Sequence, residues 1–234
     1  GVARTEHVGS VAVAGAPALG GAVRVEADGR TRILDAALQE FANRGYDGAT
    51  MAAVARRAGV TQPLVHYHFS TKHALWCAAV GREIEAIVEH FGGTFAELGD
   101  LGALDRGKVL VRRLVLFMAE HPEFGRIMAY EGVQGGPRLE WILAGGDVAA
   151  AGSGRAQLFD HLLAAGIDDG WVKPLPVPHV VSCILASSAY FFQVGATVRE
   201  QYGLDASAPE VVAAHADTVV ELVFHGIACD GGAA

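Results

Sequence analysis

The sequence predicts an all-α fold, with a small N-terminal bundle of helices followed by a larger helical domain. Apolar residues recur along most of the chain at the i, i+3, i+4 spacing of amphipathic helices, and these segments end at glycine or proline clusters. No convincing alternation of apolar and polar residues indicates a β-strand. The chain has 234 residues, of which 51% are hydrophobic, so its core can be sizeable. We expect a flexible tail over residues 1–23, a bundle over residues 24–75 and the larger domain over residues 76–234.

The N-terminal bundle should contain three helices and the start of a fourth. Their apolar positions place them at residues 33–42, 51–58, 62–69 and 71–90. Thr50, Thr61 and Ser70 each stand before a helix and can cap it, because a hydroxyl accepts a hydrogen bond from a free backbone N–H group. Gly45 and Gly59 follow the first two helices as C-terminal stops.

The larger domain should contain six further helices. Helical spacing places them at residues 105–120, 123–134, 137–144, 147–165, 178–202 and 209–228. A loop over residues 166–178, rich in Asp, Gly and Pro, separates the last two helices from the others.

The composition argues against a membrane protein and against a disulfide-rich secreted one. Even the most apolar segment, residues 177–198, contains polar side chains and falls short of the ~20 uninterrupted apolar residues of a membrane span. The three cysteines are widely spaced and lie in apolar surroundings, which favours free thiols in a reducing compartment. The first 23 residues lack the basic start and long apolar core of a secretory signal. We therefore expect a cytoplasmic protein with no membrane partner.

Charge is unevenly distributed along the chain, whose net charge is -8. Residues 24–75 hold seven basic and five acidic side chains, whereas residues 76–234 hold ten basic and twenty acidic ones. A short basic segment in an acidic chain suggests that this segment alone meets a polyanion, although an excess this small also arises by chance.

The second and third helices, joined by Gly59 and Val60, have the anatomy of a helix-turn-helix. Ala55 lies where the helices approach most closely, and Gly59 supplies a turn that a residue with a Cβ would resist. An ordinary helical hairpin is the alternative. The outward face of the third helix favours nucleic-acid binding, because it carries hydrogen-bonding and aromatic groups where a solvated face more commonly carries Glu and Lys. These residues are Thr61, Gln62, His66, Tyr67 and His68, with Lys72 and nearby arginines to contact phosphates.

Two stretches of the bundle resemble the N-terminal domain of TetR-family transcriptional regulators. Residues 31–46 read TRILDAALQEFANRGY, and after Thr50, residues 55–75 read ARRAGVTQPLVHYHFSTKHAL. The likeness covers roughly residues 28–76, and its order of motifs is specific. A weaker likeness to the family's second domain lies at residues 120–131, EHPEFGRIMAYE.

The resemblance implies a homodimer that binds a pseudo-palindromic operator in double-stranded DNA, with the third helix of each subunit in the major groove. Gln62 and Pro63 match positions that face base edges. Positions that touch phosphates, or brace the helix against them, are matched by Thr50, Thr61, Tyr67, His68 and Lys72.

Two histidines depart from the family pattern. His66 stands where the family usually has Tyr; it can donate to a phosphate or a guanine, and its protonation would strengthen binding at low pH. His73 replaces the usual Glu three residues after Ser70, which leaves the fourth helix without a capping box. A metal site formed by His66 and His68 is not expected, because helical neighbours two apart point in different directions.

Large side chains at helical spacing in the larger domain predict a cavity for a small-molecule effector, with plain core packing as the alternative. The acidic, internally apolar domain favours a neutral or cationic hydrophobic ligand. Candidate ligand-binding residues are Phe117, Phe124, Met128, Trp141, Phe159 and Tyr190. Such a ligand would swing the fourth helix and move the two recognition helices away from the ~34 Å of one DNA turn.

The last two helices are more apolar than one buried face requires, which predicts a homodimer interface, with burial inside one chain as the alternative. The candidate interface residues are Val180, Ile184, Ser187, Phe191, Val211, His215, Val219 and Leu222.

These features together predict a ligand-responsive repressor that a small hydrophobic effector releases from a palindromic operator, without a cofactor or a metal. One alternative keeps the DNA-binding module but makes the larger domain a surface for a protein partner. An all-α enzyme is the other, and the sequence contains no phosphate loop, nucleophile elbow or His-Glu-x-x-His motif to support it.

Overall fold

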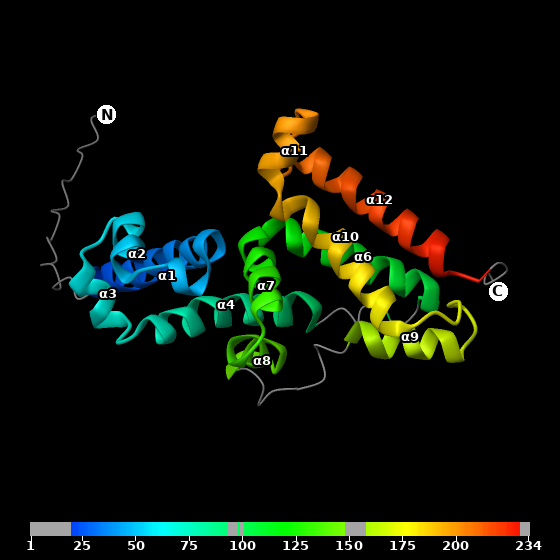
Figure 1. Cartoon of the computed structure of the whole chain (residues 1–234), viewed down its shortest axis with the longest axis horizontal. Coiled ribbons are helices and arrows are strands. Elements are labelled where there is room, and N and C mark those ends of the chain that lie inside the picture. The colour runs from blue at the N-terminus through cyan, green and yellow to red at the C-terminus, as the bar shows by residue number, and fades with distance from the viewer. Residues whose placement is uncertain (1–19, 93–97, 99–100, 148–157, 230–234) are drawn as a thin grey trace, which may run out of the picture.

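The computed structural model describes residues 20–92, 98, 101–147 and 158–229 of the chain. Within this part the chain forms eleven helices and a single isolated β-bridge, between Val172 and Ala228 (Figure 1). The all-α prediction is confirmed. Most of the expected tail, residues 1–19, lies outside the described residues, and the first helix begins at Gly20.

The N-terminal bundle consists of α1 (Gly20–Gly48), α2 (Met51–Ala58), α3 (Gln62–His68) and the start of α4 (Lys72–Gly92). Its core is made of apolar side chains that the predicted spacing turns inward, and Ile33, Phe41, Val54 and Val65 are at most 2% exposed. The expected stop at Gly45 is a non-helical residue inside the span of α1, with φ 68° and ψ 173°.

The helix caps agree with prediction at one position and differ at two. Thr50 Oγ1 accepts a hydrogen bond from the backbone N–H of Ala53 at 3.1 Å, as predicted. Thr61 occupies the N-cap position of α3, but its side chain makes no capping hydrogen bond. Ser70 was the wrong cap for α4, because Thr71 Oγ1 accepts from the N–H of Ala74 at 3.0 Å.

The second domain is formed by the remaining helices. They are α6 (Ala103–Glu120), α7 (Pro122–Gln134), α8 (Pro137–Leu143), α9 (Leu158–Asp168), α10 (Val177–Gln193), α11 (Gly195–Tyr202) and α12 (Pro209–Ile227). The long helix α4 runs from the bundle into this domain, and α7 lies between the two parts (Figure 1). α6 is the central helix, with five side chains from Leu110 to Phe117 at most 2% exposed, and it packs against α10 and α12.

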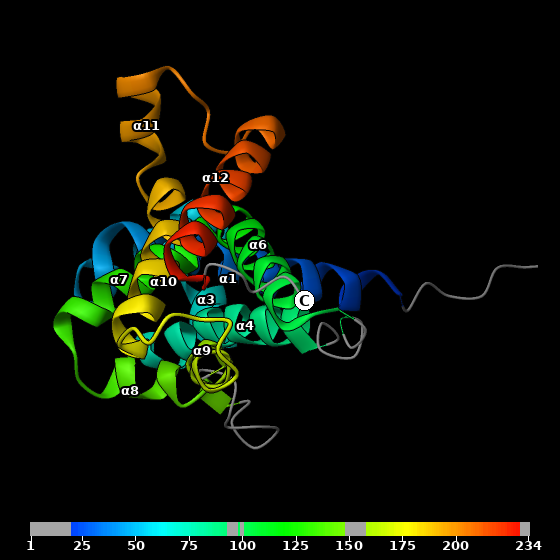
Figure 2. The ribbon, with the colours of Figure 1, turned by 90° about the vertical axis from the view of Figure 1, so that its right-hand side faces the viewer.

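The predicted single helix over residues 178–202 is two helices. The chain leaves helical geometry at Val194, with φ −105° and ψ 30°, immediately before Gly195, and α10 and α11 meet at a bend of 70°. A glycine inside an apolar helical run weakens the helix at that point. α11 consequently stands away from the body of the molecule (Figure 2).

The predicted helix over residues 147–165 also differs. Residues 148–157 lie outside the described part, and α9 continues to Asp168, beyond the predicted start of the loop. No single described helix is long and apolar enough to cross a membrane; only α10 and α11 taken together reach that length and composition, across their bend.

Candidate nucleic-acid interface and its connection to the second domain

The turn between α2 and α3 is built around Gly59, whose φ of 64° is in the left-handed region. The N–H of Val60 donates to the carbonyl of Ala55 at 3.0 Å, which closes the turn. A Cβ at Gly59 would meet no atom within 4 Å, so the backbone angle, and not crowding, is what requires glycine here. Val54 and Val65 are 1% and 0% exposed between the two helices, which fixes α3 firmly on the bundle.

The outward face of α3 presents most of the side chains predicted to contact DNA. The exposed ones are Thr61, Gln62, Pro63, His66 and Tyr67, together with Thr50 at the start of α2. The amide nitrogen of Gln62 lies 3.4 Å from Nε2 of His66, one turn further along the helix. Tyr67 is 73% exposed, so most of its large aromatic surface is left uncovered by the described residues. The arrangement offers hydrogen-bonding groups and an aromatic edge to a groove.

His68 is placed differently from its neighbours. It is half-buried, and its Nε2 is a buried nitrogen with no hydrogen-bond partner among the described residues. Its ring lies 5.2 Å from Tyr67 and 6.3 Å from Phe69, measured between ring centroids. The family resemblance implied one of two roles for this position, contact with a phosphate or bracing of the helix. The packing of His68 fits the bracing role.

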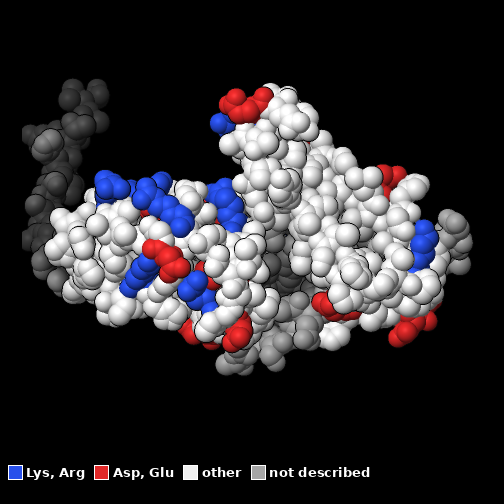
Figure 3. Space-filling view, viewed as in Figure 1, with Lys and Arg blue, Asp and Glu red and all other residues white. Residues whose placement is uncertain are grey.

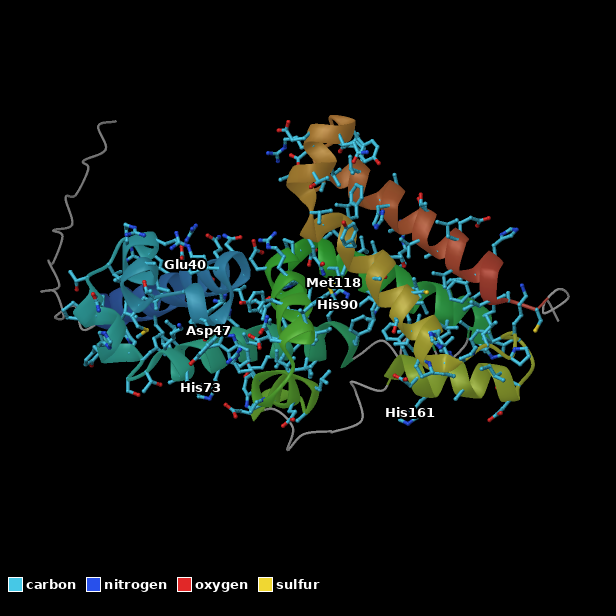
Figure 4. All side chains as sticks on the ribbon, viewed as in Figure 1. Glu40, Asp47, His73, His90, Met118 and His161 are labelled. Carbon is cyan, nitrogen blue, oxygen red and sulfur yellow. The ribbon has the colours of Figure 1, made fainter. Side chains whose placement is uncertain are left out.

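Several basic side chains lie on the N-terminal bundle, and Figure 3 shows that most Lys and Arg side chains on this face lie over it. Two of the arginines are tied to Glu40, a carboxylate 2% exposed (labelled in Figure 4). Arg57 Nε donates to its Oε1 at 2.8 Å, and Arg44 Nε lies 3.2 Å from its Oε2. The Arg57 pair joins α1 to α2, whereas the Arg44 pair lies within α1, and both leave less of these arginines free for phosphates.

Lys72 lies at the point where the bundle meets the second domain. Its ammonium is 4.7 Å from the centroid of the Tyr46 ring, and it donates to the carbonyl of Asp47 at 3.2 Å. The guanidinium of Arg138, from α8, lies 4.3 Å from the same ring. Arg138 Nε donates to both carboxylate oxygens of Glu131, at 3.0 and 2.9 Å, and Glu131 is only 1% exposed. We call Tyr46, Lys72, Glu131 and Arg138 the Tyr46 junction.

The groups around Arg138 in the Tyr46 junction favour its protonated, charged form. The hydrogen bond that Arg138 donates to Glu131, aided by the charge of that carboxylate, raises the pKa of Arg138 above its ordinary value, against the opposing effect of burial. Arg138 is therefore a permanent cation on the Tyr46 ring, in an interaction of the cation–π type.

Other contacts hold α7 and α8 against the bundle. The ring of Tyr130 lies on Gly45, where a Cβ would come within 2.3 Å of it. Trp141 of α8 packs on Trp76 of α4 with ring centroids 5.4 Å apart. On the bundle side, His73, which is labelled in Figure 4, stacks on Trp76 with ring centroids 6.3 Å apart. At the start of α7, Nδ1 of His121 lies 2.6 Å from Oε2 of Glu83, a carboxylate of α4 that is 4% exposed.

An apolar hollow lies between α6, α9, α10 and α12, in the second domain. Its volume is about 20 Å³, on the scale of the space that one water molecule requires. The hollow is lined by Gly107, Leu110, Val111, Phe159, Leu162, Leu163, Trp171, Ile184, Phe224 and Ile227. No lining residue carries a charge.

Only Phe159 of the predicted ligand-binding residues lines this hollow. Phe117 and Phe124 are buried in the core, and Met128 is half-buried. Trp141 packs against Trp76, and Tyr190 is 64% exposed. Sequence reasoning did not select Trp171 or Phe224 for this role. Their aromatic rings were the available signal, but nothing in the sequence shows which helices surround them.

The predicted dimer-interface residues divide between the interior of the subunit and its surface. Ile184 and Val219 are each 2% exposed, so they pack α10 and α12 within one chain, as the alternative reading held for them. The ring of His215 stacks on Phe191 at 4.4 Å, and its Nε2 donates to the carbonyl of Ser187 at 3.0 Å.

The other three members of this set lie at or near an apolar surface. Leu222 is 69% exposed, while Val180 and Val211 are half-buried. Two exposed apolar side chains of α10 were missing from the prediction, Leu185 at 41% and Tyr190 at 64%. The unpartnered face of these helices therefore differs in part from the predicted one.

The described residues contain no group of three or more His, Cys, Asp or Glu side chains that could hold a metal ion. The three cysteines are free: Cys77 and Cys229 are half-buried, and Cys183 is exposed.

Two family models match the chain. Residues 33–79 match "Bacterial regulatory proteins, tetR family", and residues 107–223 match "Tetracyclin repressor-like, C-terminal domain". A curated relative, the HTH-type transcriptional regulator RutR of Escherichia coli, is 28% identical over 183 residues, which cover 72% of this chain and 80% of RutR. The HTH-type transcriptional activator FasR of Mycolicibacterium smegmatis is 41% identical over 59 residues, 25% of this chain and 27% of FasR.

Solved structures share the fold at low sequence identity. The ketosteroid transcriptional regulator KstR2 of Mycobacterium tuberculosis superposes with a TM-score of 0.64 at 20% identity, covering 86% of this chain and 95% of KstR2. The transcriptional regulator FadR of Bacillus subtilis, in complex with stearoyl-CoA, gives a TM-score of 0.57 at 19% identity, covering 84% of this chain and 98% of FadR.

Proposed function

Since the chain belongs to the TetR family of bacterial transcriptional regulators, we propose that it is a repressor that a small hydrophobic effector releases from a palindromic operator. The observation that carries the proposal is the exposed, hydrogen-bonding face of α3 on a rigid helix-turn-helix. Binding of operator DNA in the cytoplasm is its first element, and control by a ligand in the second domain is its second.

DNA contact in this proposal is divided between bases and phosphates. Gln62 and Pro63 meet base edges in the major groove, where a glutamine amide can pair with adenine. His66, Tyr67 and Lys72 meet phosphates, and His68 braces α3 from within. Thr50 and Thr61, at the starts of α2 and α3, add hydroxyl contacts to the DNA backbone. Such contacts position the protein on the duplex.

A homodimer would place two such helices on the two halves of a palindrome. The exposed side chains of Leu185 and Tyr190 on α10 and of Leu222 on α12 support this part of the proposal, because these large side chains are 41%, 64% and 69% exposed in the single chain.

The effector would enter the apolar hollow beside Phe159, Trp171 and Phe224. An apolar molecule or an apolar acyl chain fits its lining. Two proteins of this fold are described with ligands that have an apolar part: FadR in complex with stearoyl-CoA, whose acyl chain is apolar although its CoA part is charged, and KstR2 as a ketosteroid regulator. Because the hollow has room for about one water molecule, a ligand must separate its helices. A ligand acts only if it binds the separated state more tightly than the closed one.

Selection of genomic DNA by the purified protein tests the DNA-binding part. We expect a palindromic site whose affinity falls steeply as salt rises, and that Gln62→Ala lowers affinity for this site more than for unrelated DNA. A folded protein that selects no sequence and binds only weakly at low salt would refute the regulator proposal.

Ligand-induced thermal stabilisation tests the effector part. A set of uncharged apolar compounds should contain members that raise Tm and lower operator affinity together. If none stabilises the protein while a protein partner does, the second domain is an interaction surface instead.

A further inference from the structure

We propose that Arg138 of α8 is a positioning residue for operator binding: through the ring of Tyr46, it holds the ammonium of Lys72 where a DNA phosphate can meet it. The inference rests on the proposed function, in which Lys72 is a phosphate contact. It assigns to a residue of the second domain a part in DNA binding that does not require it to touch DNA.

The first step of the argument is that one ring holds two cations. The ammonium of Lys72 lies 4.7 Å from the Tyr46 centroid, and the guanidinium of Arg138 lies 4.3 Å from it. Both distances are within the ~6 Å at which the electron-rich face of an aromatic ring attracts a cation. The ring is thus the shared contact of one side chain from each part of the molecule.

The second step concerns the anion that makes this arrangement possible. Two cations on one ring repel each other, and the guanidinium is partly withdrawn from water. Glu131 compensates for this, because its carboxylate, 1% exposed, accepts two hydrogen bonds from Arg138 Nε at 3.0 and 2.9 Å. A carboxylate buried this deeply requires a partner, so Arg138 is held in one position.

The third step concerns the rigidity of the ring. Tyr46 stacks on Phe41 with centroids 6.0 Å apart, and it meets the edge of Trp76 with centroids 6.2 Å apart. Because these neighbours belong to α1 and α4, the ring cannot turn freely to follow either cation. A displacement of α8 therefore changes the contact between Arg138 and Tyr46.

The last step concerns Lys72 itself. A lysine side chain has four flexible bonds, and an unrestrained one loses much of its freedom when it meets a phosphate. Here Lys72 is already restrained by the Tyr46 ring and by the carbonyl of Asp47 at 3.2 Å. Loss of Arg138 removes the contact that α8 makes with the ring. Phe41 and Trp76 still restrict the ring, but with one neighbour fewer, and Lys72 would then meet the phosphate at a greater entropic cost.

A double-mutant cycle on operator binding tests the inference, using the DNA fragment that the full-length parent protein selects. Lys72→Met should weaken binding and reduce the slope of log affinity against log salt by about one phosphate contact. Arg138→Met should weaken binding by about two- to fivefold, the fold-change of a modest cation–π contact. In the Lys72→Met background, Arg138→Met should cause no further loss.

Conservative variants distinguish a positioning role of Arg138 from a general contribution to the fold. Tyr46→Phe keeps the ring and should bind as the parent does, whereas Tyr46→Leu should behave as Arg138→Met does. If Arg138→Met unfolds because Glu131 is left unpaired, the pair Glu131→Gln with Arg138→Met removes the buried charge and serves in its place.

Independent losses in Arg138→Met and Lys72→Met, which multiply in the double variant, would overturn the inference and make Arg138 a direct DNA contact or a purely structural residue. This result leaves the proposed function intact, since the parent protein binds its site. A parent that selects no DNA would overturn both, because Lys72 would then have no phosphate to meet.

Discussion

Gly59 shows how one residue's backbone angle determines whether the recognition helix is correctly placed. We predict that Gly59→Ala lowers the free energy of unfolding by about 1–2 kcal/mol, because its φ of 64° strains any residue with a Cβ. The space around the new methyl group is open, so no collision contributes. Urea unfolding of the two proteins measures the difference.

Gly132, in the exposed part of α7, is the matched control. A Cβ there also meets no atom within 4 Å, but the residue has ordinary helical geometry. Gly132→Ala should therefore stabilise the protein, by about 0.5–1 kcal/mol. Equal effects of the two substitutions would mean that the backbone angle at Gly59 is not what requires glycine.

His215 predicts a pH dependence of stability. Partial burial between α10 and α12 lowers the pKa of His215, and the hydrogen bond to the carbonyl of Ser187 offsets only part of this. Because the folded pKa is below the unfolded one, the unfolded chain binds the proton more readily, and stability is lost as pH falls through the ordinary imidazole pKa of about 6.5.

Chemical unfolding at pH 8 and at pH 5.5 measures this effect, with His215→Phe as the reference that cannot titrate. The stability of the parent should fall between the two pH values by more than that of the variant. The expected excess is below about 1 kcal/mol because the ring is only half-buried. An excess of zero or of opposite sign would contradict the assigned direction of the pKa shift.

At the scale of elements, the start of α4 allows a direct test of which hydroxyl caps it. Thr71→Ala should lower the free energy of unfolding by about 1 kcal/mol, since Thr71 Oγ1 accepts from the N–H of Ala74 at 3.0 Å. Ser70→Ala should change it by at most about 0.5 kcal/mol, because Ser70 is exposed and the cap lies one residue further on. Thermal or urea unfolding decides between the residues, and a larger loss at Ser70 would restore the original assignment.

The same pair of residues shows the limit of prediction for helix ends. Ser70 and Thr71 are both good cap residues, and a sequence pattern places a helix end only to within one or two residues. The short helices α2 and α3 were predicted within this limit, because Thr50, Gly59 and Pro63 act locally in the sequence. The bend between α10 and α11 was missed because an apolar run with a single Gly195 fits one helix equally well.

The candidate DNA-contacting residues could be predicted from the sequence more fully than the residues that line the hollow. Every predicted DNA-contacting residue except Thr50, the N-cap of α2, lies on α3 or within a few residues of its ends, so the local pattern was sufficient to collect them. The hollow instead takes Phe159 from α9, Ile184 from α10 and Phe224 from α12. Hydrophobic spacing shows that such side chains are buried, but it does not show against which helix.

At the scale of the whole molecule, the two domains are connected by packed side chains as well as by the chain. The Tyr130 ring on Gly45 joins α7 to α1, and Trp141 on Trp76 joins α8 to α4. His121 and Glu83, 2.6 Å apart, join the start of α7 to α4. A displacement of α7 or α8 is therefore transmitted to α1 and α4, the helices that form the bundle with α3, through packed side chains.

The proposed homodimer can be tested at Leu222 on α12. A two-fold symmetric interface repeats every substitution on both subunits, so Leu222→Glu would place two carboxylates in an apolar contact. We expect the variant to shift towards monomer in analytical ultracentrifugation. Its operator affinity should fall by at least about tenfold, because two half-sites are no longer bound by one linked particle.

Leu143→Glu is the matched control for that substitution, because Leu143 is also a well-exposed leucine, at 54% compared with 69% for Leu222, but lies on α8, away from α10 and α12. It should remain dimeric and bind the operator as the parent does. A Leu222→Glu variant that stays dimeric with unchanged affinity would exclude this face of α12 from the interface. If Leu143→Glu dissociates instead, the dimer forms through α8, and the exposed apolar side chains of α10 and α12 would need another partner.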